Sequence, residues 1–287
     1  MFMRADSLKL KIINFVLILA LFVNWGRPDF LFSGRGIAYK LWQRGMWLVL
    51  NYQTKTYETL TSTNFILKYT QADQELAPLI LPLAEDYLFK VEKILGIKQK
   101  KYRIPLVLYH DEETLNKSFG WSGDKSAVGV YWAGTIRLVS PQAWSEHLVE
   151  NTSALWATFQ REGPLAHELT HLFIDEATKG NYPRWLTEGL AQYVEEEITG
   201  FILSEPSVES KAHPYPFASL VSDFDRQPDQ FLAYWQSLQA VRNLLEEYGR
   251  ERLTGLLAEL RQGKGFYQAF ANNYGLNFAE FEQNLKY

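Results

Sequence analysis

Cysteine is absent from this chain of 287 residues, and with it all thiol chemistry. The protein therefore forms no disulfide bonds, and it can offer a metal ion only nitrogen and oxygen ligands. A strong excess of charge is also missing, since 33 acidic residues oppose 29 basic ones and the formal net charge is −4. Domains that bind nucleic acid usually carry a basic surplus, so DNA and RNA are not expected partners.

Internal repeats and low-complexity tracts are missing as well, so the length predicts one large or two modest globular domains. Apolar residues make up 47% of the sequence, which is enough to bury a substantial core. Many exported proteins also lack cysteine, and its absence therefore says little about the cellular compartment.

A long apolar run occurs near the N-terminus, over residues 12–23, and basic residues precede it. Trp25 follows the run at a position typical of a membrane interface. A small-x-small cleavage site does not follow, so residues 1–25 are predicted to be an uncleaved signal anchor in preference to a cleaved signal peptide. The basic flank predicts a cytoplasmic N-terminus. We therefore expect a single N-terminal membrane anchor and an extracytoplasmic domain.

Residues 26–56 are predicted to be a juxtamembrane amphipathic segment. Within it, apolar residues over 37–50 recur at helical spacing, with charged and polar residues between them. Such a helix could lie in the membrane interface, or it could pack on the domain that follows. The sequence leaves both positions open.

The sequence His-Glu-Leu-Thr-His at residues 167–171 carries the strongest functional information. On a helix, His167 and His171 lie on one face, one turn apart, where both imidazoles can reach the same zinc ion. Glu168 can act on a water molecule at that ion without being a ligand itself. Glu188, seventeen residues after His171, is the candidate for the third protein ligand.

The flanking sequence predicts two helices with a break between them. Gly163-Pro164 is a favourable helix start, because proline at the first helical position loses no hydrogen bond. Residues 179–183 end this helix, and a second helix then places Glu188 in its first two turns. The small Gly189 would let this helix approach a neighbour closely. The alternative interpretation is a helix whose histidines are merely hydrogen-bonded core residues.

These segments resemble the gluzincin metallopeptidases, the clan of thermolysin and aminopeptidase N, in the form of small peptidase MA-like domains. The pattern Pro-x-Trp-Leu-x-Glu-Gly-Leu-Ala at residues 183–191 is similar to the second motif of the clan. In that motif the glutamate is the third zinc ligand, a role that falls on Glu188 here. The metzincin pattern is excluded, because it needs glycine at 174 and histidine at 177, where this chain has Ile174 and Ala177.

The resemblance implies an α+β, zincin-like fold for residues 57–287. A small mixed sheet would pack on the motif helix in an α/β lobe over 57–200, and a mainly helical second lobe would follow over 201–287. Strand-like alternation over 65–70 and 104–109, and a hairpin near 129–139, agree with such a sheet. By resemblance, the hairpin would supply an edge strand to which an extended peptide substrate could add.

One position, Gln192, departs from the pattern of the clan, and another, Tyr234, is a candidate for a further catalytic role. Gln192 stands where thermolysin-like enzymes have an aspartate that orients a zinc-bound histidine, and an amide does not raise ligand basicity as a carboxylate does. Another acid could take that role, and Asp175 and Glu195 are nearby in the sequence, but solvated helix residues are the favoured interpretation of both. Clan members often stabilise the oxyanion with a tyrosine or histidine of the second lobe, and Tyr234 is the candidate, although helical aromatics are more often core residues.

Together these features predict zinc-dependent hydrolysis of peptide bonds. Zn²⁺ would be held by His167, His171 and Glu188, with Glu168 as general base and Tyr234 as oxyanion donor. The expected partners are a peptide or protein substrate and the membrane, through the anchor. The alternative is a non-catalytic zincin-fold protein that binds an envelope component or another partner. A Gly-x-Met-Glu-Asn-like motif is not visible, so endopeptidase and exopeptidase action both remain open.

Overall fold

The computed structural model describes residues 32–98, 102–121, 127–144 and 152–285. The predicted anchor over residues 1–25 lies outside this part of the chain. Among the helices that are described, none combines the length and the apolar character needed to cross a membrane. The chain divides into two compact units, Met1–Lys55 and Thr56–Tyr287.

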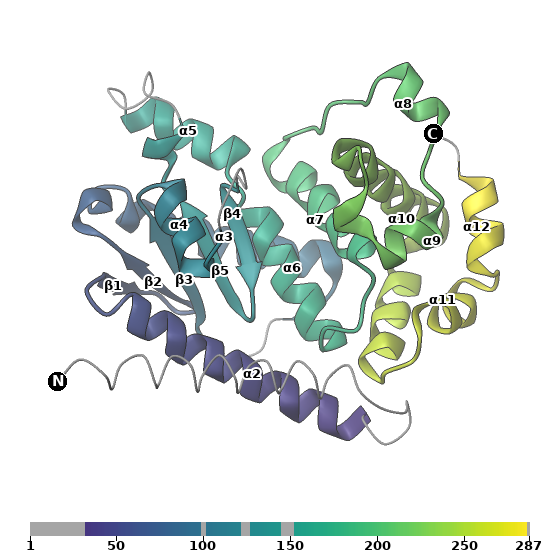
Figure 1. Ribbon diagram of the computed structural model, residues 1–287, viewed down its shortest axis with the longest axis horizontal. Coiled ribbons are helices and arrows are strands. Elements are labelled where there is room, and N and C mark those ends of the chain that lie inside the picture. Colours follow the sequence, from purple (N-terminus) through teal and green to yellow (C-terminus); the bar gives the residue numbers. More distant parts are fainter. Residues whose placement is uncertain (1–31, 99–101, 122–126, 145–151, 286–287) are drawn as a thin grey trace. The chain divides into compact units, whose positions relative to one another are not determined.

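In the first unit the structure describes one helix, α2 (Phe32–Gln53), drawn in purple in Figure 1. It lies inside the predicted juxtamembrane segment and confirms that residues 37–50 are helical. Its two predicted positions, in a membrane interface or on the following domain, stay predictions.

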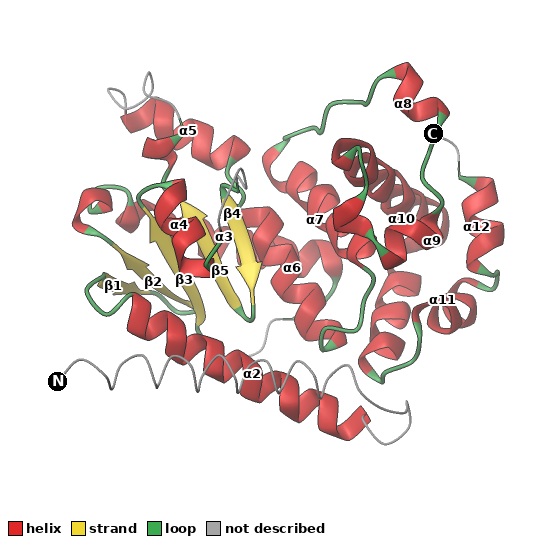
Figure 2. Cartoon of the chain, in the orientation of Figure 1, coloured by secondary structure: helices red, strands yellow, loops and turns green. Residues whose placement is uncertain are grey.

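The second unit begins with a five-stranded mixed sheet (Figure 2), in the order β1-β2-β3-β5-β4. Its strands are β1 (Glu58–Thr61), β2 (Phe65–Tyr69), β3 (Ile104–Tyr109), β4 (Gly129–Trp132) and β5 (Thr135–Val139). The three central strands are parallel, and β1 and β4 are antiparallel to their neighbours. The predicted strands and hairpin are confirmed. Ala133 and Gly134 connect the hairpin with positive φ values of 53° and 81°, as a two-residue type I′ turn requires.

Different helices cover the two faces of the sheet. On one face lie α3 (Ala77–Leu95) and α6 (Leu165–Thr178), and on the other lies α4 (Glu112–Phe119). Side chains that alternate along the central strands form the core under α3 and α6, namely Phe65, Leu67, Ile104, Leu106, Ile136 and Leu138. The predicted packing of a small sheet on the motif helix is therefore confirmed.

The rest of the unit is helical (Figure 1). Between β5 and α6 lies α5 (Thr152–Glu162), and α7 (Arg184–Thr199) follows α6 after a left-handed turn at Lys179 and Gly180. The second lobe contains α8 (Val208–Ala212), α9 (Phe217–Ser222), α10 (Gln230–Arg261), α11 (Phe266–Tyr274) and α12 (Phe278–Asn284). Three short 3₁₀ turns are η1 (Gln71–Asp73), η2 (Pro141–Ala143) and η3 (Phe224–Arg226). The mainly helical second lobe is thus as predicted, and Gly249 is a non-helical residue within α10.

The helices α7 and α10 approach each other closely at Gly189. A Cβ atom added to Gly189 would lie 2.3 Å from the carbonyl oxygen of Ser237 on α10. A side chain of any size would therefore push the two helices apart. The close approach predicted from Gly189 is confirmed, and it brings the start of α10 beside the helix that carries Glu188.

Candidate metal centre

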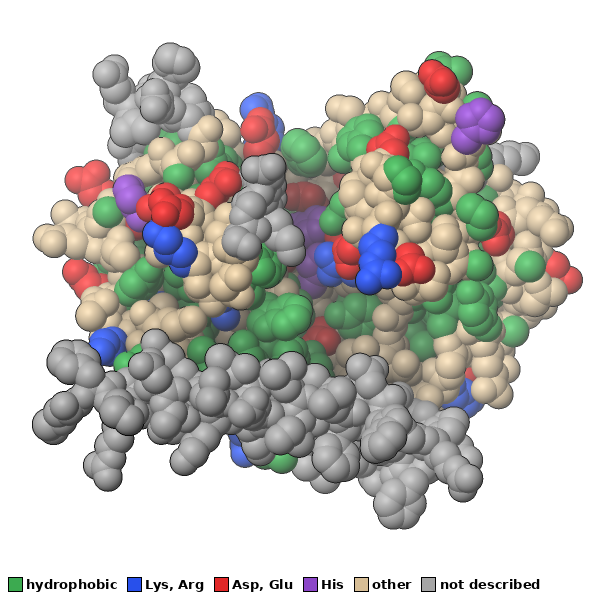
Figure 3. All heavy atoms as spheres, in the orientation of Figure 1, with side chains coloured by type: hydrophobic (Ala, Val, Ile, Leu, Met, Phe, Trp, Pro, Cys, Tyr) green, Lys and Arg blue, Asp and Glu red, His purple; other side chains and the backbone are tan. Residues whose placement is uncertain are grey.

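Side chains from α6 and α7 converge at one point. Nε2 of His167 lies 3.3 Å, and Nε2 of His171 lies 3.5 Å, from Oε2 of Glu188. One ligand atom from each of the three residues lies within 4.8 Å of the other two. The histidines are one turn apart on α6, and α7 packs against that helix. Figure 3 shows histidine side chains, in purple, in a hollow at the centre of the visible face.

This cluster has the chemistry and spacing of a metal site. Bonds of about 2.1 Å in tetrahedral geometry place neighbouring ligand atoms about 3.4 Å apart, close to the separations of 3.3 and 3.5 Å found here. Two imidazole nitrogens and one carboxylate oxygen leave one position of a tetrahedron open, as catalytic metal sites do and closed structural sites do not. His167, His171 and Glu188 therefore fit a divalent metal ion.

Each of the three side chains is held by a further contact. Nδ1 of His167 lies 3.1 Å from a carboxylate oxygen of Glu195, and Nδ1 of His171 lies 2.7 Å from the hydroxyl of Thr187. A histidine that donates through Nδ1 presents the lone pair of Nε2 to a metal. Arg184 contacts Oε1 of Glu188 at 3.0 Å, which leaves Oε2 directed toward the histidines.

Glu195, and not Gln192, contacts the Nδ1 atom of His167. Gln192 instead donates its amide to the backbone carbonyl oxygens of Glu188 and Tyr234, at 3.3 and 3.1 Å. Seven residues make almost two helical turns, so Glu195 lies on nearly the same side of α7 as Glu188, whereas four residues rotate Gln192 further away. The interpretation of Glu195 as a solvated residue was wrong, although its spacing from Glu188 indicated that both side chains lie on nearly the same side of the helix.

Asp175 is also not a solvated residue. It lies one turn beyond His171 on α6, is 2% exposed, and accepts a hydrogen bond of 2.5 Å from the hydroxyl of Tyr131. The same hydroxyl accepts the backbone N–H of Gly134 at 3.1 Å. Asp175 therefore ties the β4–β5 hairpin to the motif helix.

Glu168 lies against the edge strand β4. The backbone N–H of Tyr131 donates to Oε2 of Glu168 at 2.5 Å. Val128 pairs with Val139 on β5, and alternation along an antiparallel pair then turns the N–H of Tyr131 away from β5. Gly129 makes this approach possible, because a Cβ at that position would lie 2.5 Å from Pro164 at the start of α6. The strand thereby fixes one oxygen of the carboxylate.

The pKa values of the two buried glutamates of the site are shifted in opposite directions. Burial raises the pKa of Glu168, an effect that the neighbouring His171 and His167 oppose only in part. Burial also acts to raise the pKa of Glu188, but His171, His167 and Arg184 outweigh it and hold that pKa well below its usual value. Two carboxyl groups whose pKa values are pushed apart suit different roles, an ionised ligand at Glu188 and a proton carrier at Glu168.

His167 is polarised by two carboxylates. Burial alone lowers the pKa of His167, but the contacts with Glu188 and Glu195 outweigh this and hold the pKa well above its usual value. The negative charge around the ring thus favours a cation at this position, whether it is a proton or a metal ion.

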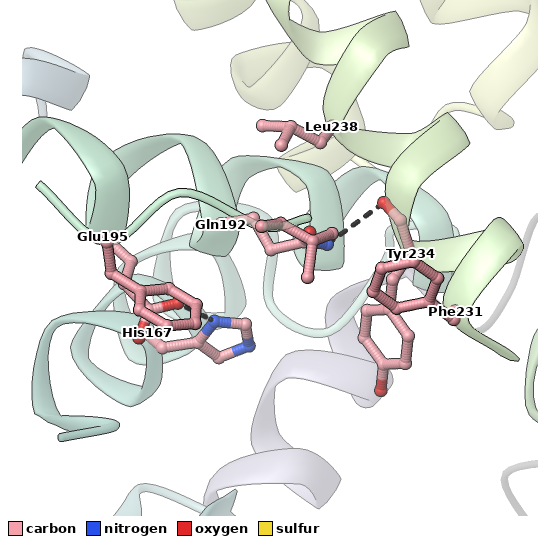
Figure 4. A pocket seen from close by; sticks show the side chains of 8 residues that line it. His167, Gln192, Glu195, Phe231, Tyr234 and Leu238 are labelled. Carbon is pink, nitrogen blue, oxygen red and sulfur yellow. Dashed lines mark hydrogen bonds and ion pairs between the residues drawn. The ribbon is translucent and has the colours of Figure 1, made fainter. Parts of the chain in front are cut away.

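Tyr234 lies at the beginning of α10, in the wall of a pocket that also includes His167 (Figure 4). Its side chain interacts with Arg184, the residue that contacts Glu188. Burial raises the pKa of Tyr234, and the charge of Glu188 raises it further, so the phenol keeps its proton. The structure therefore brings Tyr234 close to the three converging side chains.

The orientation of His167 gives the first prediction. Glu195→Gln should weaken metal binding by about 10–100-fold, because a neutral amide is a poorer partner for the Nδ1–H of a ligating imidazole. Competition with a chromogenic chelator measures the change in Kd. Glu197→Gln is the matched control, since it removes the same charge from an exposed position on the same helix. Equal Kd values for the two variants would contradict an orienting role for Glu195.

A family model described as the Peptidase MA superfamily matches residues 84–287, which is more than two thirds of the sequence. The match includes both helices of the metal centre and the second lobe. None of the curated proteins compared matches this chain.

Proposed function

This chain belongs to the Peptidase MA superfamily, and we propose that it is a zinc-dependent peptidase that hydrolyses peptide bonds. The observation that carries the proposal is the convergence of His167, His171 and Glu188 on α6 and α7, with Glu168 beside them. A peptidase-like domain implies a peptide or protein substrate. Two imidazoles and one carboxylate are a usual ligand set of catalytic zinc, which supports zinc as the metal.

His167 and His171 would hold the ion through Nε2, and Glu188 through Oε2. When bound, zinc acts as a Lewis acid that lowers the pKa of water and polarises a carbonyl group. Thr187, Glu195 and Arg184 keep the ligand atoms in place.

Glu168 would carry the proton. The backbone N–H of Tyr131 holds Oε2, so Oε1 is the atom that takes the proton of the attacking water and then delivers it to the leaving amine. The burial that raises the pKa of Glu168 favours the protonated form between these two steps. The phenol of Tyr234, which keeps its proton, would donate a hydrogen bond to the oxyanion that forms at the scissile carbonyl.

Metal content and turnover of the full-length protein test this proposal. Purified without chelators, the protein should contain about one zinc per chain and cleave components of a mixed peptide library. A chelator should abolish cleavage, and added zinc should restore it. A zinc-loaded protein that cleaves none of the library would favour the non-catalytic alternative, and a protein that binds no metal would contradict both.

Tyr234→Phe tests the oxyanion donor. The variant should lower kcat by roughly 10–10³-fold, the loss of a single donor at a site where a metal also stabilises charge, and it should keep its metal. Tyr248→Phe removes a hydroxyl from the same helix away from the metal centre and serves as the control. If Tyr234→Phe is as active as its control, the role of Tyr234 is to pack against Phe224. The two rings are in edge-to-face contact, with their centroids 5.3 Å apart.

The membrane attachment proposed for this domain rests on the sequence. The basic residues before the apolar run at 12–23 favour a cytoplasmic N-terminus and an extracytoplasmic peptidase. This placement stays a prediction.

A further inference from the structure

A pocket opens beside His167, in the second unit of the chain. Its volume is about 190 Å³, and α6, α7, α10 and the segment that follows α7 all contribute to its wall. Figure 4 shows His167 and Glu195 on one side, Phe231 and Tyr234 on the other, and Gln192 and Leu238 between them. The pocket thus shares a wall with one of the proposed metal ligands.

The polar groups in this wall have interaction partners within the protein. Glu195 contacts His167, Gln192 donates to two backbone carbonyl oxygens, and the side chain of Tyr234 interacts with Arg184. What they leave accessible is mostly apolar. The remaining lining residues are Phe201, Leu203, Phe231 and Leu238.

The mouth of the pocket is apolar too. Phe201 and Phe231 line the pocket and are 39% and 38% exposed, and Ile202, which follows Phe201 in the sequence, is 67% exposed. Large apolar side chains at the surface are energetically favourable sites for an apolar group to cover. A ligand that enters from this side therefore meets apolar surface before it reaches the interior.

The volume of the pocket fits one large side chain. An apolar protein cavity of about 150 Å³, lined by aliphatic and aromatic side chains, takes up one benzene molecule. A pocket of about 190 Å³ accordingly accepts a phenyl ring or a branched aliphatic group. Glu195 is among the lining residues, and lysine and arginine are not. The carboxylate of Glu195 would therefore repel an acidic side chain of a ligand, and no basic side chain in the wall would compensate.

We propose that this pocket receives one large apolar side chain of the substrate, phenylalanine or leucine, from a residue next to the scissile bond. The inference rests on the proposed peptidase function, which places the reacting carbonyl at the metal. Successive residues of an extended chain are at most about 3.6 Å apart. A pocket that includes the ring of His167 is therefore within reach of residues that flank the scissile bond and not of distant ones.

The test compares peptides that differ at a single residue. That residue, on either side of the scissile bond, is Phe, Leu, Ala, Glu or Lys. Two readouts are used with the full-length protein loaded with zinc: kcat/KM of the wild type, and the Kd of the same peptides for Glu168→Gln, which needs no turnover. At one of the two positions, Phe or Leu should be favoured over Ala by about 10–200-fold, the range that hydrophobic pockets achieve, and Glu and Lys should be disfavoured.

Leu203→Trp fills the pocket and tests whether the pocket causes this preference. It should reduce the preference for Phe over Ala to within about threefold, and circular dichroism shows whether the variant is folded. Ile202→Trp is the matched control, because it adds the same side chain at the neighbouring residue, which does not line the pocket. It should leave the preference unchanged.

The outcomes separate this inference from the proposed function. Turnover without preference for an apolar residue, or with preference for Lys, overturns the pocket assignment and leaves the peptidase intact. Absence of turnover, with tight binding of the Phe peptide that Leu203→Trp abolishes, overturns the peptidase and keeps the pocket as an apolar binding site. Absence of both turnover and selective binding overturns both.

Discussion

Glu168→Gln should lower kcat by about 10²–10⁴-fold, the usual contribution of a general base, while the protein keeps its metal. The amide preserves the shape of the side chain, and it can still accept the backbone N–H of Tyr131 that holds Oε2. It cannot take a proton from water. Glu168 faces the metal centre without being one of the three converging ligands, so zinc content should not change. Steady-state kinetics and metal analysis of the same preparation measure the two quantities.

The control for this experiment is Glu176→Gln, which removes the same charge from α6 about two turns further along. Its kcat should remain close to that of the wild type. Wild-type turnover by Glu168→Gln, on a substrate that the wild type cleaves, would refute the mechanism. Loss of zinc from Glu168→Gln would instead indicate that Glu168 supports the ligands.

Replacement of a proposed ligand should remove most of the metal. The variants are His167→Ala, His171→Ala and Glu188→Ala. Each should weaken zinc binding more than Glu195→Gln does, for which a loss of about 10–100-fold is expected. Two remaining protein ligands rarely retain zinc at a catalytic site. Peptide cleavage should fall in parallel and should not recover at zinc concentrations that saturate the wild type.

Circular dichroism shows whether these variants are folded, and His213→Ala is the control, because His213 is exposed at the end of α8. This control should keep full zinc occupancy. Full occupancy and unchanged affinity in Glu188→Ala would show that the third ligand is another residue.

The motif helices were predictable because their signals are local. A proline at the helix start, left-handed residues at its end, and two histidines one turn apart all act within a few residues. The hairpin turn was predictable for the same reason. The strand β1 was not predicted, because it is short and has an exposed pattern. The helix α4 was also not predicted, although Asp111 caps its start and Gly120 ends it.

The contacts around the metal centre depend on the placement of distant segments. The backbone of Tyr131 reaches Glu168, 37 residues further along the chain, only because the β4–β5 hairpin packs beside α6. A backbone N–H has no sequence signature, so this contact could not be predicted from the type of residue. Glu195 could have been predicted, since its spacing from Glu188 lies close to two helical turns.

The contact at Gly189 determines how the cleft can respond to a substrate. The backbones of α7 and α10 already touch there, and α6 packs on α7 from the other side. Packed interfaces of this kind adopt discrete arrangements and do not deform gradually. The proposed ligands, Glu168 and Tyr234 therefore lie on helices that are already packed on one another. A substrate would find the site already assembled, and little of its binding energy would be consumed in closing the lobes around it.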